Sequence, residues 1–464
     1  MQESKESKKR METKENSQTR QFYTTFRQLA IPIALQHMVV STVNLVDVFM
    51  LAALGTIAVA GVGLANQVYF LLVVLNYGLY SGMGVFLAQY WGKRDMKHIH
   101  CTLGLGLSVG TVAALLFTAA AIFFPYPILR FLSHDEAALL LGASYLRIVG
   151  FSYLFTSLSN CLGIALRSVG QPRFPLLTST LALLLNVLLN YLLIFGKLGL
   201  PALGADGAAI GTLLSRTVEF LLLMGLILRY HRFILANVRE MLDFPRTFIL
   251  HYAKIAAPVI VNESLWGLGM VMYVAAYEKL GTDALAVSQV TSTVQNLTEL
   301  VAMGIGNAAA VMIGNIIGEG SPEKAFLYAQ RFLRITFLLG ALTGLLLAAC
   351  IPLILWAVQM TPEVKELLLR TLLICAALVP LKAASVVIIV GILRGGGDTR
   401  YAMLLEALNV WLIGVPLAFI GALAWKLPIY WLMLLINLEE VGKVAVGLHR
   451  TWSKRWITDV TRES

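Results

Sequence analysis

Long apolar runs separated by short polar stretches dominate this sequence. A helix of about twenty apolar residues crosses a lipid bilayer, and these runs are that long and lack the alternation of barrel strands. The pattern therefore predicts an all-α integral membrane protein with twelve transmembrane helices. The predicted spans lie near residues 29–53, 57–88, 101–125, 137–166, 174–196, 207–228, 252–277, 284–316, 328–356, 367–393, 401–425 and 427–448. The last span is the weakest, because Glu439 and Glu440 interrupt it.

Composition supports a membrane protein. Of the 464 residues, 58% are hydrophobic and only 13% are charged, whereas soluble domains carry roughly 25% charged residues. The segment 1–28 is polar and basic, so it does not predict a cleavable signal peptide. The four cysteines lie in or beside apolar runs without paired spacing, so we expect free thiols and neither a disulfide framework nor a metal centre.

Lysine and arginine residues gather on one side of the predicted bundle. The loops after even-numbered spans and both terminal segments are rich in them, while the loops after odd-numbered spans hold few. By the positive-inside rule we expect both termini in the cytoplasm, in a multi-pass protein of the cell (inner or plasma) membrane. The net charge of +10 then reflects topology, so we expect a lipid bilayer and no nucleic acid as a partner.

A repeated phrase divides the chain into two halves. Residues 54–64 read LGTIAVAGVGL and residues 280–290 read LGTDALAVSQV, 226 positions later. Pro32 and Pro258 keep this offset, and LRSVGQPR at 166–173 matches LRGGGDTR at 393–400 with a one-residue slip. Two parallel repeats of this kind form a common transporter architecture. The predicted segments are a cytoplasmic tail (1–28), a six-helix lobe (29–229), an interfacial cytoplasmic linker (230–249), a second six-helix lobe (250–449) and a cytoplasmic tail (450–464).

The two lobes, an aspartate late in the first span before LGTIAVAGVGLANQ, LRSVGQP after the fourth span, and LNVLLNYLLIFGKLGLPALGADGAAIGT at 185–212 together resemble the multidrug and toxic compound extrusion (MATE) family. The resemblance covers about residues 22 to 450. It implies a V-shaped pair of lobes around a central cavity. It also implies export of organic, often cationic, compounds in exchange for protons or sodium ions, with no cofactor beyond the coupling ion.

Intramembrane ionisable residues are functional candidates by default, because burying them costs several kcal/mol. Asp47 is the single charge of the first span, and the resemblance implies that it binds the coupling cation. Asn186 and Asn190 are four residues apart on one helix face, and the resemblance adds Thr212 to the same site. We expect a cation-coupling cluster there, with a sodium ion held by Asp47, Asn186 and Asn190 as one candidate occupant. A polar clamp between helices is the structural alternative.

The second half has a different set of candidates, Glu263, Glu299 and Lys382. Glu263 matches the carboxylate of the family's second-half cation site. The aspartate that completes that site corresponds to Ala383 here, so the family pattern is broken. We therefore consider an ion pair between Glu263 and Lys382, or binding of a cation or substrate by these residues.

Several further residues carry weaker signals. His37 is the repeat partner of Glu263, and Tyr273 is the repeat partner of Asp47. Tyr77 and Trp266 are aromatic candidates for a cavity that binds amphipathic cations. Near the predicted membrane ends lie Arg216, Glu219 and Glu406, whose long side chains we expect to reach the interface.

The leading prediction is therefore a secondary active antiporter for small organic compounds, acting as a monomer. A flippase for lipid-linked saccharides is an alternative, and it would need a strongly cationic cavity. An intramembrane enzyme is disfavoured, because the sequence holds no GxxxxGK[ST], HExxH or GxSxG motif and no cluster of nucleophile and base.

Overall fold

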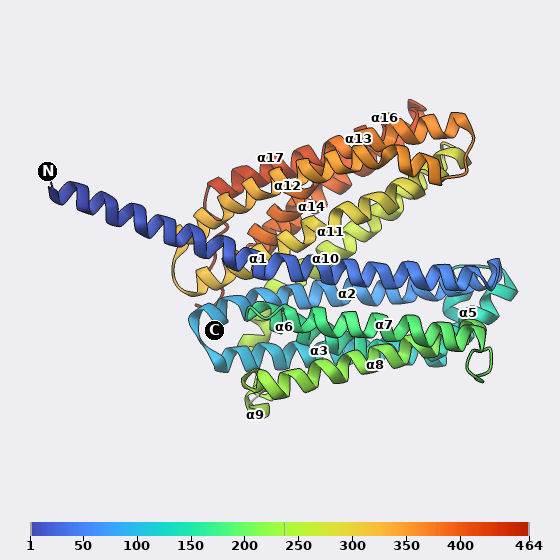
Figure 1. Ribbon diagram of the computed structural model, residues 1–464, viewed down its shortest axis with the longest axis horizontal. Helices are drawn as coiled ribbons and strands as arrows, with labels where there is room; N and C mark the ends of the chain where they lie inside the picture. The colour runs from blue at the N-terminus through green and yellow to red at the C-terminus, as the bar shows by residue number, and fades with distance from the viewer. Residues whose placement is uncertain (1, 236, 463–464) are drawn as a thin grey trace.

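The computed structural model describes residues 2–235 and 237–462, and the side chains from residue 19 onwards except that of Asn44. Helices account for nearly all regular structure in this part of the chain, and the one bridge of strand type joins Gly397 and Ile457. The helices form two lobes that converge at the end holding both termini and splay apart at the other end, which gives a V (Figure 1).

The first lobe, called the N-lobe here, contains the first eight helices, and a short linker follows it. The N-lobe helices are α1 (Gln2–Ala52), α2 (Thr56–Lys93), α3 (Met96–Phe123), α4 (Pro125–Arg130), α5 (Glu136–Val149), α6 (Ser152–Ser168), α7 (Arg173–Phe195) and α8 (Gly204–Tyr230). The linker holds η1 (Arg232–Leu235) and α9 (Val238–Leu242). Because α1 begins at Gln2, most of the predicted 1–28 tail is continuous with the first span.

The second lobe, called the C-lobe here, starts with α10 and is less regular. Its helices are α10 (Arg246–Glu278), α11 (Thr282–Gly318), α12 (Pro322–Ala357), α13 (Pro362–Val386), η2 (Val387–Arg394), α14 (Thr399–Asn409), η3 (Val410–Gly414), α15 (Val415–Phe419), η4 (Ile420–Ala424), α16 (Ile429–Ile436) and α17 (Leu438–Trp452). The segments η2, η3 and η4 are π-helical, and such wide turns recur near functional sites.

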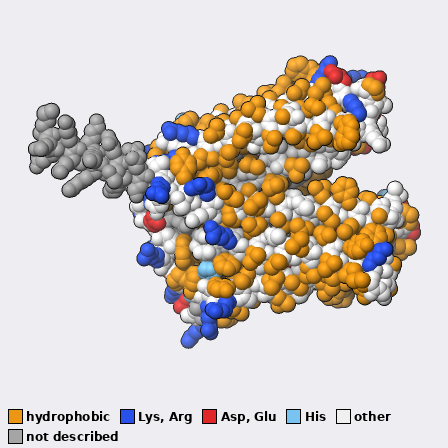
Figure 2. Space-filling model, in the orientation of Figure 1, with side chains coloured by type: hydrophobic (Ala, Val, Ile, Leu, Met, Phe, Trp, Pro, Cys, Tyr) orange, Lys and Arg blue, Asp and Glu red, His pale blue; other side chains and the backbone are white. Residues whose placement is uncertain are grey.

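The apolar helices match the predicted spans closely. Ten described helices are long and apolar enough to cross a membrane, and α5 with α6, bent by 51° to each other, makes an eleventh if the pair is counted as one span. The twelfth predicted span is split at Asn437 into α16 and α17, and Glu439 and Glu440 open α17. A band of hydrophobic side chains covers the length of both lobes, and Lys and Arg gather at the end with the termini (Figure 2).

The two lobes contact each other through equivalent helices of each repeat. Helix α2 packs on α10, and α1 packs on α11. A Cβ on Gly92 would stand 1.9 Å from the carbonyl oxygen of Asn315, and a Cβ on Gly318 would stand 1.9 Å from that of Gln89. The repeat relates these two contacts to each other, because Gly92 corresponds to Gly318 and Gln89 corresponds to Asn315. The Tyr77 hydroxyl and the Met303 sulfur, which are repeat partners themselves, lie 3.8 Å apart, so the pseudo-twofold axis passes between α2 and α11.

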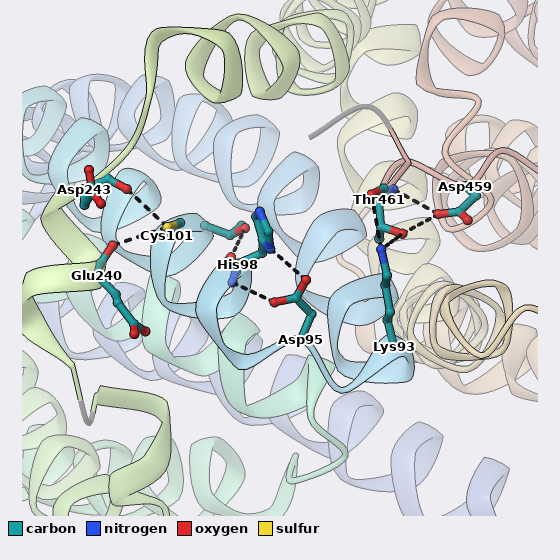
Figure 3. Close-up of polar contacts among 9 residues, drawn as sticks. Lys93, Asp95, His98, Cys101, Glu240, Asp243, Asp459 and Thr461 are labelled. Carbon is teal, nitrogen blue, oxygen red and sulfur yellow. Dashed lines mark hydrogen bonds and ion pairs between the residues drawn. The ribbon is translucent and has the colours of Figure 1, made fainter.

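The segment after α17 joins the lobes at the end where they converge. Thr458 donates its N–H to the carbonyl of Gly396 in the C-lobe at 2.8 Å. The amide of Gln89 on α2 donates to the Thr458 carbonyl at 3.0 Å and accepts from the Val460 N–H at 2.8 Å. Lys93 donates to the Thr461 hydroxyl at 3.4 Å (Figure 3). We call residues 456–461 the C-terminal strap.

The linker docks beneath the N-lobe at the same end. The Cys101 thiol on α3 donates to the carbonyls of Glu240 and Asp243 at 3.3 Å each (Figure 3). His100 lies 2.7 Å from the Glu240 carboxylate. A Cβ on Gly104 would stand 1.8 Å from the Met241 carbonyl, so the linker is packed against the lobe rather than lying free in the membrane interface.

The close approach of α2 and α11 generates a stability prediction. Gly92→Ala places a methyl group against the backbone of Asn315, and the helices must separate to accommodate it. We expect a loss of about 1–3 kcal/mol, typical of overpacking, measured as a lower midpoint of thermal unfolding in detergent. Gly225→Ala on α8, where a Cβ meets nothing within 4 Å, is the matched control and should be neutral. Equal midpoints for the two variants would contradict the contact.

Candidate functional site

The predicted cation-coupling residues come together in the N-lobe. The Asn190 amide donates to the Asp47 carboxylate at 2.6 Å and to the Asn186 carbonyl oxygen at 3.3 Å. The Asn186 amide donates to the Thr212 hydroxyl at 3.4 Å. We call these four residues the amide cluster. They come from α1, α7 and α8, so one continuous hydrogen-bonded chain ties three helices together.

Local sequence explains how the amide cluster can form. Asn186 and Asn190 are one turn apart on α7 and are both buried. Helix α8 approaches α7 closely because it presents glycine there, and a Cβ on Gly211 would stand 2.2 Å from the Asn190 carbonyl oxygen. That oxygen is buried and accepts no hydrogen bond within the described part of the chain. An oxygen without a donor, beside a carboxylate, is a favourable ligand for a cation.

The amide cluster opens onto a cavity of about 630 Å³ inside the N-lobe. Its walls come from α1, α2, α5, α6, α7 and α8, with Asn307 of α11 added from the C-lobe. Asp47, Asn186 and Thr212 line it, and so do His37 and Tyr77. Trp266 lies on α10 outside the cavity wall. The volume is in the range of cavities that hold drug-sized ligands.

A second series of hydrogen-bonded side chains lines the same cavity. The location of two of its members was predicted wrongly from the sequence. Arg216 lies 2.8 Å from the Glu219 carboxylate, and that carboxylate accepts a 2.7 Å bond from Ser179. Gln36 donates to the same Ser179 hydroxyl at 3.2 Å. We expected Arg216 and Glu219 to reach the membrane interface, but both line the cavity. The i, i+3 spacing of the pair on one helix was the signal that sequence reasoning could have used.

In the C-lobe, Glu263 is paired, but not with Lys382. Its carboxylate lies 2.7 Å from the guanidinium of Arg394, which is only 2% exposed. The Glu406 carboxylate lies 3.6 Å from the same guanidinium and accepts a 2.5 Å bond from Asn262. We call these four residues the arginine cluster. The considered Glu263–Lys382 pair is therefore wrong, and so is the expectation that Glu406 reaches the interface.

The other C-lobe candidates belong to a neighbouring charged group. Lys443 lies 3.1 Å from Glu439 and 3.0 Å from Glu440. Tyr273 donates a short hydrogen bond to Glu439. Glu299 and Lys382 are near enough to interact electrostatically. The repeat partner of Asp47 is thus a tyrosine that donates to a glutamate. In this lobe each of the two buried paired cations, Arg394 and Lys443, faces two carboxylates.

A bundle of duplicated, apolar helical halves with a polar cavity between its helices is typical of one class of protein, the membrane transporters. Comparison with known proteins makes the class specific. The MatE family model matches residues 32–192 and again residues 258–420, which start 226 positions apart. The chain therefore belongs to the MatE family of multi-pass membrane transporters.

Named relatives and solved structures agree with this family. The chain is 23% identical to "Probable multidrug resistance protein NorM" of Thermotoga maritima, covering 94% of each chain. It is 28% identical to the protein of the same name from Bradyrhizobium diazoefficiens, covering 87% of each. A structure described as an outward-facing multidrug resistance MATE family transporter superposes with a TM-score of 0.82 at 20% identity, covering 93% of this chain and 96% of that one. The fold prediction of two homologous helical bundles in a V is confirmed.

The arginine cluster gives the second prediction. Arg394→Met removes the cation between two buried carboxylates, so we expect a loss of about 3–5 kcal/mol and a low yield of folded protein. Adding Glu263→Gln and Glu406→Gln should recover much of that loss, because no uncompensated charge is left. The measurement is the yield of monodisperse protein together with its thermal unfolding midpoint.

A control separates the Glu263–Arg394 pair from the Glu263–Lys382 pair that the sequence suggested. Glu263→Gln combined with Lys382→Met should be no better than Glu263→Gln alone, because Lys382 lies outside the arginine cluster. Recovery by Lys382→Met would mean that Lys382, and not Arg394, balances Glu263.

Proposed function

We propose that this protein is a secondary active antiporter that exports small organic compounds in exchange for protons or sodium ions. The observation that carries the proposal is the amide cluster on the wall of the N-lobe cavity. A chain of hydrogen bonds through the two asparagine amides links the Asp47 carboxylate to the Thr212 hydroxyl, and the side-chain oxygen of Asn190 has no donor among the described residues. Oxygen ligands of this kind suit a sodium ion, and the carboxylate alone suffices for a proton.

The same cavity supplies the coupling. Asp47 and the remaining wall share one space of about 630 Å³. A cation on Asp47 neutralises the carboxylate and alters its bonds to Asn190, and with them the packing of α1 against α7. Because α1 also packs on α11 of the other lobe, a shift of α1 is felt at the lobe interface. Cation and substrate thereby compete for one cavity, which is the requirement for exchange.

The transmembrane orientation follows from the charge distribution. The two ends of the chain lie at one end of the molecule (Figure 1), and Lys and Arg side chains gather at the same end (Figure 2). The positive-inside rule assigns that end to the cytoplasm. With the lobes joined there and apart at the other end, the described conformation corresponds to an outward-facing state.

The cavity charges argue against the flippase alternative. Its charged wall residues are Asp47, Glu219, Arg167 and Arg216, so two carboxylates balance two guanidinium groups. A site for a pyrophosphate-linked lipid would need a clear excess of positive charge. A mixed wall favours smaller compounds with both polar and apolar parts.

The transport prediction concerns Asp47. Asp47→Asn keeps the size and much of the hydrogen bonding but removes the charge, so we expect normal folding, retained dye binding and loss of gradient-driven efflux. Asp47→Glu should keep partial activity. The assay is efflux of rhodamine 123 from proteoliposomes, driven separately by a sodium gradient and by a pH gradient. Wild-type efflux by Asp47→Asn would assign coupling to another residue.

The same preparation tests the competition. Reciprocal linkage requires that the coupling cation weaken substrate binding to the same degree as substrate weakens cation binding. We expect rhodamine 123 affinity to fall when the effective cation is added to wild-type protein, and to be insensitive to it in Asp47→Asn. An affinity that does not respond to either cation in wild type would count against exchange through one cavity.

The orientation is tested by labelling. Cysteines introduced at the exposed positions Lys97 and Arg239 should resist an impermeant thiol reagent in intact cells, and one at the exposed position Lys197 should react. Wild-type protein, whose Cys101, Cys161 and Cys375 are buried, measures the background. The reverse labelling pattern would place both termini outside.

A further inference from the structure

The arginine cluster of the C-lobe has a counterpart in the N-lobe with a different charge. The repeat relates Asn262 to Gln36 and Glu263 to His37, at the same offset that separates the two LGT phrases. With the one-residue slip of the two LR segments, it also relates Arg394 to Arg167 and Glu406 to Ser179. The same cation is therefore present in both lobes. Both carboxylates that balance it in the C-lobe are replaced by a histidine and a serine in the N-lobe.

The surrounding geometry is shared between the lobes. Gln36 donates to Ser179 at 3.2 Å, and Asn262 donates to Glu406 at 2.5 Å, so the same helix-to-helix bond occurs in each lobe. In the C-lobe, Glu263 and Glu406 lie 2.7 and 3.6 Å from Arg394. In the N-lobe, the described residues offer Arg167 no ion pair and no hydrogen bond. The helix-to-helix bond is thus kept in the N-lobe, but no carboxylate there pairs with Arg167.

The unpaired guanidinium faces the cavity. Arg167 lines the cavity from α6, and Thr156, Ser159 and Asn160 of the same helix line it too. The hydroxyls of Thr156 and Ser159 are buried and have no hydrogen-bond partner in the described structure. Of the two carboxylates on the cavity wall, Glu219 already binds Arg216 and Ser179. Arg167 therefore faces a space lined by hydroxyls without partners, and no described carboxylate lies within ion-pair distance of it.

An unpaired cation inside a membrane protein is costly, and an entering anion relieves that cost. The planar guanidinium matches a carboxylate or sulfonate with two parallel hydrogen bonds. At the other side of the cavity, Asp47 offers a negative charge. His37, whose repeat partner pairs with the second arginine, is ten residues from Asp47 on α1, which corresponds to about 15 Å along a helix. This separation suits a drug-sized ligand with opposite charges at its two ends.

We propose that Arg167 is the anion-binding end of the substrate site, so that the cavity takes amphiphilic compounds carrying a carboxylate or sulfonate, including zwitterions whose cationic end faces Asp47. This inference rests on the proposed export function, because it names the substrate class of the same cavity. It narrows the expectation of organic, often cationic, compounds, since a lone positive charge would gain nothing at Arg167.

The test compares two dyes that differ in one group. Rhodamine 110 has a free carboxylate, and rhodamine 123 is its methyl ester. Binding to the purified full-length protein in detergent is followed by fluorescence anisotropy, without any ion gradient. We expect wild type to bind rhodamine 110 at least five-fold more tightly. Arg167→Gln should weaken rhodamine 110 at least ten-fold and change rhodamine 123 less than two-fold, and Arg167→Lys should be intermediate.

A second variant tests the anion site while keeping Arg167. His37→Glu places a carboxylate at the position equivalent to Glu263, where it can pair with Arg167 as Glu263 pairs with Arg394. We expect it to abolish the preference for rhodamine 110 and to leave rhodamine 123 binding in place. Thermal unfolding and size-exclusion profiles of each variant confirm that it is folded.

Three outcomes would overturn the anion site: no binding of rhodamine 110 to wild type, equal losses of both dyes in Arg167→Gln, or an unchanged preference in His37→Glu. These outcomes are independent of the transport assay. A dye preference that depends on Arg167 in a protein that does not export would support the anion site and count against antiport. Export by a protein that shows no dye preference would support antiport and count against the anion site.

Discussion

A charge buried within a membrane must be balanced by an opposite charge, by water or by a ligand, and this constraint organises the whole molecule. The C-lobe meets it internally for its buried paired cations, since Arg394 lies between Glu263 and Glu406 and Lys443 contacts Glu439 and Glu440. The N-lobe meets it partly through the Arg216–Glu219 pair and otherwise through an open cavity. The C-lobe is thus built around its own ion pairs, and the N-lobe holds the cavity in which we propose that ions and compounds bind.

Gene duplication explains why the two lobes share a scaffold, and the substitutions explain why they differ in chemistry. Asp47 is replaced by Tyr273, His37 by Glu263 and Ser179 by Glu406 at equivalent positions. The two glycine contacts between the lobes are equivalent, since Gly92 meets Asn315 and Gly318 meets Gln89. The lobe interface demands symmetry because each half supplies the same surface, whereas the interior of each lobe is free to diverge.

Much of the fold could be predicted from the sequence, because span length, charge asymmetry and the internal repeat are local or periodic signals. The amide cluster was also predictable, since Asn186 and Asn190 share a helix face and the family resemblance supplied Asp47 and Thr212. The partner of Glu263 was not, because Arg394 lies far from it along the chain and at the end of its span, where a long cation normally reaches the interface. The match of LRSVGQPR with LRGGGDTR relates Arg167 to Arg394, but a sequence repeat does not show which side chains face either guanidinium. The break at Asn437 and the strap lack any periodic signal.

The C-terminal strap has a thermodynamic consequence for the conformational cycle. It joins Gln89 and Lys93 of one lobe to Gly396 of the other largely through main-chain groups. If the lobes part at this end, the strap must detach from at least one of them, and each lost hydrogen bond costs about 0.5–1.5 kcal/mol. Three such bonds amount to about 1.5–4.5 kcal/mol, which biases a two-state equilibrium by roughly ten- to two-thousand-fold toward closure of this end. The C-terminal strap therefore favours the conformation that is closed at this end. It raises the binding free energy that an incoming compound must supply to open it.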